Sequence, residues 1–275
     1  MTWSKNTITK KLLSSGLIAL DYFQKTKISI KPDRTIVTEA DQAIEDYLTE
    51  ELDRPDQGIY LLGEETQATK STAYFDSAMK SKMYIVDPID GTAPYSAGLP
   101  TWGISIGYAE NGILTQGAIY LPVFNEIYIS EGDKVYLLKI KDGEVISDQE
   151  LYAKHGDYDA NRLISVTQTV TKKGTVNLPN TIHSLCCAVM PLAYIIHGRY
   201  MAYLGTLKVW DLAGGLPLIH KLGFECHLMS GKKFGPEITK EIYHLEGDHC
   251  WRLRDTSIFA SPGIAQKIIP HISGY

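Results

Sequence analysis

Residues 102–140 consist of short apolar runs separated by turn residues, and this pattern restricts the fold more than any other feature. Within residues 102–108 one face would carry Trp102, Ile104, Ile106 and Tyr108, and the other Gly103, Ser105 and Gly107. Strict alternation is typical of a β-strand. Asn-Gly at residues 111–112 is a hairpin signal. Three further strand-like runs follow at residues 113–121, 125–130 and 134–140, so the pattern predicts an antiparallel meander.

Two amphipathic helices are predicted before this meander. Apolar side chains at helical spacing predict a first helix over residues 8–23, with Leu17 and Leu20 on its broad buried face. Thr-Glu-Ala-Asp at residues 38–41 matches a capping box and predicts a second helix that ends near Leu52. We therefore expect a sheet packed against two helices in the N-terminal half.

The C-terminal half has a different pattern. Residues 141–160 are polar, and we place a lobe boundary there, between residues 1–145 and residues 146–275. Beyond it a helix is predicted over residues 184–197, and Asp211 is expected to cap another helix. Because strands and helices alternate along this half, we expect an α/β lobe.

Composition excludes several classes of protein. The chain of 275 residues has 27 Lys and Arg against 32 Asp and Glu, a formal net charge of −5, which does not favour nucleic acid as a partner. The sequence contains no run of about 18 apolar residues, so no membrane span is expected. Without a secretory signal, four cysteines are expected to be reduced thiols in the cytoplasm, namely Cys186, Cys187, Cys226 and Cys250.

Carboxylates follow the predicted strands. Glu64 comes after the run 59–62, Asp87 and Asp90 come after the run 83–86, and Asp211 stands in the second lobe. Oxygen ligands are what Mg²⁺ accepts, and a pair of such ions would suit phosphoryl displacement. The sequence thus indicates a candidate magnesium site.

The same residues also have ordinary structural interpretations. Asp211 and Asp41 could serve only as helix caps, and Glu64 could belong to a solvated turn. Asp87-Pro88 and Asp90-Gly91 are common turn sequences. Spacing alone leaves both interpretations open.

Asp-Pro-Ile-Asp-Gly-Thr at residues 87–92 resembles the signature of the inositol monophosphatase superfamily, the Mg²⁺-dependent, lithium-sensitive phosphatases. The other motifs of that family follow in register at residues 38–41, 63–65 and 210–213, and the resemblance extends over about residues 12–269. It implies a layered αβαβα sandwich, classed as α/β (α+β), with an antiparallel-sheet N-terminal lobe and an α/β C-terminal lobe. It also implies an active site between the lobes and a homodimer.

The resemblance further implies a set of metal ligands. Glu64, Asp87 and the carbonyl of Ile89 would hold a first Mg²⁺, and Asp87, Asp90 and Asp211 a second. Glu64 would also reach a third, weaker ion and take part in catalysis. Two or three Mg²⁺ ions are therefore expected.

Catalytic and substrate-binding roles are implied in the same way. Thr92, paired with Asp41, would orient the attacking water. The backbone N–H groups of Gly91 and Thr92 would bind phosphate, and Asp90 and Asp211 would lie beside the substrate. The partner would be a small phosphorylated metabolite.

Several positions depart from the family pattern. Leu204 stands where the inositol-specific enzymes have a glutamate that contacts the inositol ring, and Pro94 replaces a residue beside the phosphate. Residues 184–188 bring thiols to the substrate side, while residues 31–35 and 100–102 look more like the histidinol-phosphate phosphatase branch.

The expected function is Mg²⁺-dependent hydrolysis of a small phosphate monoester, with inositol phosphate as the family default. Histidinol phosphate, 3′-phosphoadenosine 5′-phosphate and fructose 1,6-bisphosphate remain as alternative substrates within the superfamily. A protein of a different class, which senses a phosphorylated ligand without turnover, also remains open.

Overall fold

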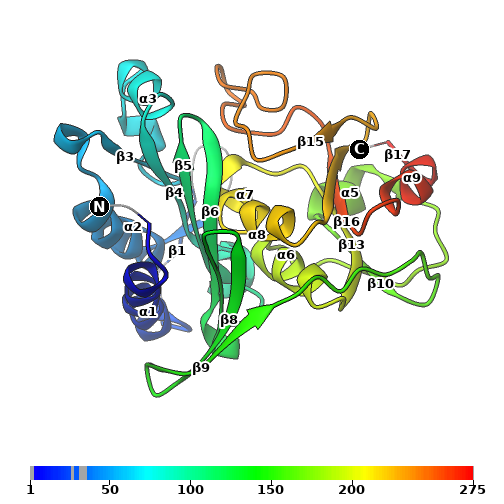
Figure 1. Cartoon of the computed structure of the whole chain (residues 1–275), viewed down its shortest axis with the longest axis horizontal. Coiled ribbons are helices and arrows are strands. Elements are labelled where there is room, and N and C mark those ends of the chain that lie inside the picture. The colour runs from blue at the N-terminus through cyan, green and yellow to red at the C-terminus, as the bar shows by residue number, and fades with distance from the viewer. Residues whose placement is uncertain (1–2, 26–27, 31–35, 275) are drawn as a thin grey trace.

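The computed structural model describes residues 3–25, 28–30 and 36–274, and it has five layers (Figure 1). Helices α1 (Lys5–Tyr22) and α2 (Glu39–Leu52) cover the outer face of a seven-stranded sheet. Between this sheet and a six-stranded sheet lie α6 (Val189–Ile196), α7 (Val209–Ala213) and α8 (Leu216–Lys221). Helices α5 (Gln168–Lys173) and α9 (Ala265–Ile268) form the last layer. The αβαβα expectation is confirmed.

The first sheet has the strand order β3-β4-β5-β6-β7-β8-β9. Its strands are β3 (Ile59–Gly63), β4 (Lys82–Asp90), β5 (Gly103–Glu110), β6 (Ile113–Leu121), β7 (Glu126–Glu131), β8 (Lys134–Lys141) and β9 (Glu144–Leu151). The meander from β4 to β9 is antiparallel, but β3 pairs with β4 in parallel. The expected antiparallel sheet is confirmed from β4 to β9. The pairing of β3 with β4 departs from it, because α3 (Thr72–Ala78) lies in a crossover between the two strands.

Strand β9 lies in the polar segment that the sequence marks as a lobe boundary. It pairs with β8 along its length, so the first sheet extends to Leu151 rather than ending near residue 145. Most of its residues are exposed, because β9 is the edge strand of the sheet. Its apolar pair Val145 and Ile146 is exposed, so these residues do not form the buried face that marks a core strand.

The second sheet has the order β12-β10-β13-β16-β14-β15. Its strands are β10 (Leu163–Val166), β12 (Ile182–His183), β13 (Tyr200–Gly205), β14 (Glu225–Leu228), β15 (Lys233–Phe234) and β16 (Ser257–Ala260). Two small sheets pair β1 (Ile28–Ile30) with β2 (Ile36–Thr38) and β11 (Thr175–Val176) with β17 (Ile272–Ser273). The remaining short helices are α4 (Thr92–Ser96), η1 (Pro55–Gln57), η2 (Gln67–Thr69), η3 (Pro122–Phe124) and η4 (Ile269–His271).

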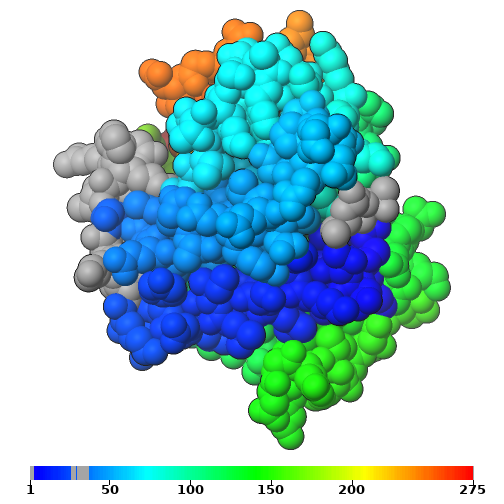
Figure 2. All heavy atoms as spheres, turned by 90° about the vertical axis from the view of Figure 1, so that its left-hand side faces the viewer, coloured from blue at the N-terminus to red at the C-terminus, as the bar shows by residue number. Residues whose placement is uncertain are grey.

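Helix α1 packs beside α2, and the two run side by side across one face of the molecule (Figure 2). Ile8, Leu12 and Ala19 are completely buried, whereas Leu17 is 64% and Leu20 39% exposed. The prediction that Leu17 and Leu20 lie on the buried face is wrong. Leu17 follows Leu12 by five positions, which turns it roughly 140° away around the helix. Across the described residues, no helix has the length and apolar character to cross a membrane.

The small residues of β5 let a helix lie directly on the sheet. A Cβ atom on Gly107 would be 2.5 Å from the Cβ of Ala213 and 2.6 Å from its carbonyl oxygen. The Ser105 hydroxyl donates to the Trp210 carbonyl at 2.9 Å and accepts from the Gly214 N–H at 3.0 Å. The Gly-Ser-Gly face of β5 therefore fixes α7, the helix that carries Asp211.

Replacing Gly107 with Ala should destabilise this contact, because the added methyl group meets the backbone of α7. We expect a loss of about 1–3 kcal/mol in the free energy of unfolding, or roughly 2–10 °C in Tm, measured by thermal unfolding. Gly235→Ala is the control, because its Cβ would meet only the flexible end of Glu237. An equal Tm for both variants would contradict close packing of α7 on β5.

Candidate active site

The C-terminal end of β4 carries the first group of predicted site residues. Asp87, Ile89 and Asp90 are buried there, and the pairing with β5 is irregular between Asp87 and Asp90. The chain then turns through Gly91, which has φ +94°. A Cβ atom at Gly91 would lie 2.8 Å from the carbonyl oxygen of Thr101, so a glycine is required at this turn.

Asp90 connects this strand to the second half of the molecule. Its Oδ2 accepts hydrogen bonds from the backbone N–H groups of Ala188 and Val189, each at 2.6 Å. These N–H groups stand at the N-terminus of α6, where a negative charge is favourable. Helix α6 begins at Val189, so the prediction of a helix from residue 184 is wrong. Residues 184–188 instead form a loop at the site, and Cys186 in it has φ +59°.

Asp211 enters the site from α7. It occupies the third position of that helix rather than the N-cap position that the sequence predicts. Its carboxylate accepts a hydrogen bond from the N–H of Lys208, the N-cap residue, at 2.8 Å. This is the carboxylate half of a capping box, which resembles an N-cap in sequence because both place an acid at a helix start. The ammonium of Lys208 lies 3.9 Å from Glu64 Oε1.

Asp87, Asp90 and Asp211 meet at one point. One carboxylate oxygen from each lies within 4.8 Å of the others. Asp87 Oδ1 is buried without a hydrogen-bond partner, which is unfavourable unless a cation or water satisfies it. A group of carboxylate oxygens with one unsatisfied member fits a divalent cation of the Mg²⁺ type.

These residues line a cavity of about 390 Å³, which we call the acidic cavity. Its lining combines predicted site residues with others, namely Glu64, Asp87, Ile89, Asp90, Gly91, Thr92, Ala93, Gln168, Cys186 and Asp211. The structure thus brings together every predicted ligand, as well as Gly91 and Thr92.

Burial and electrostatic repulsion raise the pKa values of the three clustered aspartates. Burial raises the pKa of Asp87 well above its ordinary value, and the charge of Glu64 adds to this effect. Burial also raises the pKa of Asp90 well above its ordinary value, and the charge of Asp211 is the next largest cause. Burial, followed by Glu64, raises the pKa of Asp211 from 3.8 to about 7. Without a cation, the folded protein therefore favours protonated carboxyl groups.

Thr92 and Asp41 lie next to each other, as expected. The Thr92 hydroxyl is 3.4 Å from Asp41 Oδ1 and donates to the Ile89 carbonyl at 3.0 Å. Asp41 Oδ2 accepts from both the N–H and the hydroxyl of Thr38, at 2.8 and 2.6 Å. The capping box is therefore confirmed, and it orients the other oxygen of Asp41 towards Thr92.

A second cavity of about 190 Å³, which we call the side cavity, adjoins the acidic cavity. The two cavities share Asp90, Gln168, Cys186 and Asp211. The other residues that line the side cavity are Thr167, Thr169, Cys187, Ala188, Tyr203, Thr206 and Leu207. The sequence motifs do not mark Gln168, which begins α5 two residues after the end of β10.

Leu204 does not reach either cavity. It is completely buried, in a core cluster that includes Ile164, Val166 and Ile258. The expectation that Leu204 faces the substrate is therefore wrong, because its side chain lies on the opposite face of β13 from Tyr203. Residues 31–35, which suggested the histidinol-phosphate branch, fall outside the described part of the chain.

Comparison with known proteins agrees with this geometry. A sequence model of the inositol monophosphatase family matches residues 6–262. The chain belongs to the inositol monophosphatase family. As a member of this family it is a phosphatase, a hydrolase of phosphoric monoesters.

Three relatives illustrate the range of the family. Inositol monophosphatase 1 of Solanum lycopersicum is 30% identical, over 80% of this chain and 82% of that protein. A fructose-1,6-bisphosphatase/inositol-1-monophosphatase of Thermotoga maritima is 28% identical, over 73% and 74%. A histidinol-phosphatase of Chlorobaculum parvum is 32% identical, over 42% and 43%.

Solved structures share the fold. The inositol monophosphatase of Thermotoga maritima superposes with a TM-score of 0.73 at 21% identity, covering 96% of this chain and 94% of that chain. The extragenic suppressor protein SuhB of Bartonella henselae gives a TM-score of 0.74 at 20% identity, covering 97% and 96%.

The raised carboxyl pKa values predict how stability depends on pH. The folded protein holds protons that the unfolded chain releases near pH 4, so metal-free stability should fall as pH rises towards about 7. We expect Tm in EDTA to decrease from pH 5 to pH 8, and added Mg²⁺ to reduce this decrease because the ion binds the ionised form. Asp211→Asn should make Tm in EDTA depend less on pH, because one of the carboxyl groups with a raised pKa is removed. Identical profiles with EDTA and with Mg²⁺ would contradict the assignment.

Proposed function

We propose that this phosphatase hydrolyses a small phosphate monoester with an uncharged alcohol part, in a reaction that requires Mg²⁺. The observation that carries the proposal is the acidic cavity with its unsatisfied Asp87 oxygen, joined to a side cavity without charged residues of its own. The relatives named above support the reaction type.

The lining of the acidic cavity supports the ligand set that the family resemblance implies. Glu64, Asp87 and the carbonyl of Ile89 would hold one ion, and Asp87, Asp90 and Asp211 a second, with Asp87 shared. Glu64 would also contact a third, weaker ion. Ions bound there would activate water and neutralise charge on the phosphate.

The protein's own groups position the reactants. The Thr92 hydroxyl, held between Asp41 and the Ile89 carbonyl, would accept a hydrogen bond from the attacking water and direct it at phosphorus. The N–H groups of Gly91 and Thr92 would donate to phosphate oxygens. No protein nucleophile is needed, because phosphoryl transfer depends mainly on positioning and charge neutralisation.

The side cavity supports a neutral leaving group. Apart from the two shared aspartates, the described residues that line it carry amide, hydroxyl, thiol or apolar groups, such as Gln168, Thr206 and Tyr203. A second phosphate would find no cation among them, and a cationic amine would find no carboxylate other than the expected metal ligands. Inositol phosphate is therefore our first candidate, ahead of histidinol phosphate and the bisphosphates.

We extend the proposal to the setting of the enzyme. All four cysteines are free thiols, which supports a reducing, cytoplasmic environment. By analogy with the superfamily, we propose a homodimer that Li⁺ inhibits. A phosphorylated-ligand sensor would need neither Thr92 nor its Asp41 partner, so turnover is the better interpretation.

A substrate panel tests the proposal directly. We expect phosphate release from inositol 1-phosphate with Mg²⁺, and none with EDTA, because the cluster needs cations. Histidinol phosphate, 3′-phosphoadenosine 5′-phosphate and fructose 1,6-bisphosphate should react more slowly, since each carries a further charge. An aryl phosphate reports generic activity, and added Li⁺ tests inhibition. No release from any substrate, with Mg²⁺ still raising Tm, would favour the sensor.

Replacing Thr92 with Ala removes the hydroxyl beside Asp41 and should lower kcat by about 100-fold or more, while Mg²⁺ still raises Tm. Thr92→Ser keeps the hydroxyl and should retain most activity. Steady-state kinetics of both variants measure kcat. A normal kcat for Thr92→Ala would show that other groups orient the water.

A further inference from the structure

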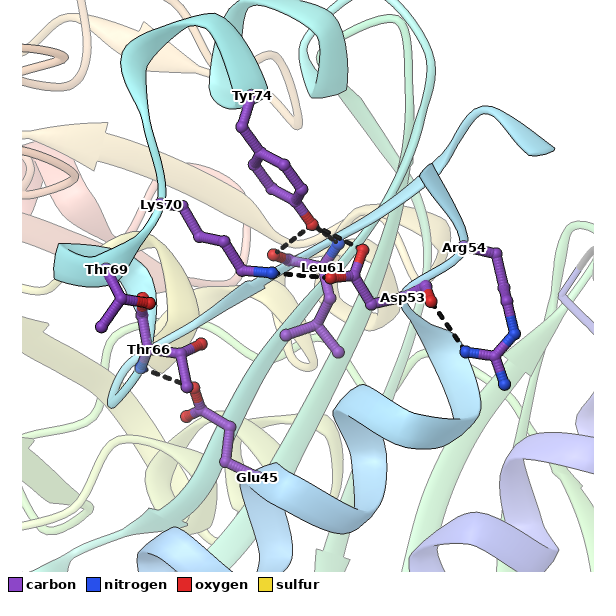
Figure 3. Close-up of polar contacts among 8 residues, drawn as sticks. All are labelled: Glu45, Asp53, Arg54, Leu61, Thr66, Thr69, Lys70 and Tyr74. Atoms are coloured by element: carbon purple, nitrogen blue, oxygen red, sulfur yellow. Dashed lines mark hydrogen bonds and ion pairs between the residues drawn. The ribbon is translucent and has the colours of Figure 1, made fainter. Parts of the chain in front are cut away.

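Glu45 is a completely buried carboxylate on α2 that no part of the mechanism above uses. Its Oε2 accepts a hydrogen bond from the N–H of Glu65 at 2.9 Å, and its Oε1 accepts one from the N–H of Thr66 at 2.7 Å. Figure 3 shows Glu45 reaching from its helix to the chain at Thr66. Both oxygens are acceptors, a pattern that a carboxylate satisfies and an amide does not.

Gly63, the last residue of β3, leaves the space that this carboxylate occupies. A Cβ atom at Gly63 would lie 2.1 Å from Glu45 Oε1 and 2.3 Å from its carboxyl carbon. The backbone at the end of β3 therefore lies directly against the carboxylate. Glu64 stands between Gly63, which contacts Glu45, and Glu65, which donates to it.

We propose that Glu45 is a positioning residue, which holds the backbone on both sides of Glu64 so that the Glu64 side chain faces the acidic cavity. This inference rests on the proposed function, in which Glu64 binds a divalent cation. Glu45 lies four residues after Asp41 on the same face of α2. One helix thereby sets both the Thr92 hydroxyl, through Asp41, and the Glu64 segment, through Glu45.

A neighbouring polar network provides a matched control. The Tyr74 hydroxyl donates to Asp53 Oδ1 at 2.6 Å and accepts from the Leu61 N–H at 2.8 Å, and Lys70 pairs with Asp53 at 2.7 Å (Figure 3). These contacts hold the middle of β3 and the end of α2. They do not include the N–H groups of Glu65 and Thr66, so loss of the Tyr74 hydroxyl should destabilise the region without releasing Glu64.

The experiment compares Mg²⁺ binding, without turnover, in the full-length wild type and three variants. Isothermal titration with Mg²⁺ alone gives the affinity, and thermal unfolding in EDTA gives the stability. Glu45→Gln keeps the size of the side chain but turns an amide NH₂ towards a backbone N–H. We expect it to weaken Mg²⁺ binding by about 10-fold or more, as supporting residues around metal ligands do. Gly63→Ala should have the same effect by displacing the carboxylate.

Tyr74→Phe should lower Tm but change Mg²⁺ affinity by less than about 2-fold. Substitution of a residue that supports metal ligands typically lowers metal affinity by about 10–100-fold. The proposal is overturned if folded Glu45→Gln and Gly63→Ala bind Mg²⁺ as tightly as the wild type. It is also overturned if Tyr74→Phe weakens binding equally, since general loosening would then explain the loss. Wild type that binds Mg²⁺ but releases no phosphate would refute the proposed function and leave this comparison intact.

Discussion

Burying Asp87 and Asp90 beside Asp211 is the constraint on which the rest of the structure depends, because like charges repel one another and lose their hydration. The fold offsets this cost with backbone N–H groups and helix starts. Asp90 accepts two N–H groups at the start of α6, and Asp211 accepts the N–H of Lys208 at the start of α7. Asp87 keeps an unsatisfied oxygen, and that remaining cost is what a bound cation would remove.

These contacts join the two halves of the molecule. Asp90 belongs to a strand of the first sheet, whereas α6 and α7 pack between the sheets. Close approach is possible because β5 presents Gly103, Ser105 and Gly107 to the helices, and larger side chains would hold α7 away. The alternation of large and small residues along β5 predicts a strand. Its small-residue face also sets where α7, and with it Asp211, lies.

Local patterns predicted much of the fold. The capping box at Thr38, the hairpin at residues 111–112 and the order of strands in the meander all follow from spacing and turn chemistry, and the structure contains them. Errors arose where solvent exposure or partners decide the outcome. Leu17 and Leu20 fit a helical face that nothing covers, and β9 is a polar edge strand. The parallel pairing of β3 and β4 depends on a crossover that no local signal reveals.

The sequence by itself determined the family and, through it, the phosphatase class, because the motif at residues 87–92 and the other acidic motifs keep the order of residues that the family signature has. Only the tertiary structure decided which way each side chain points. It buried Leu204 on the far face of β13, lined the side cavity with Gln168, and placed Glu45 beneath the Glu64 segment. The physical reason is that orientation and burial depend on contacts between residues distant in the chain, which spacing along one strand or helix does not encode.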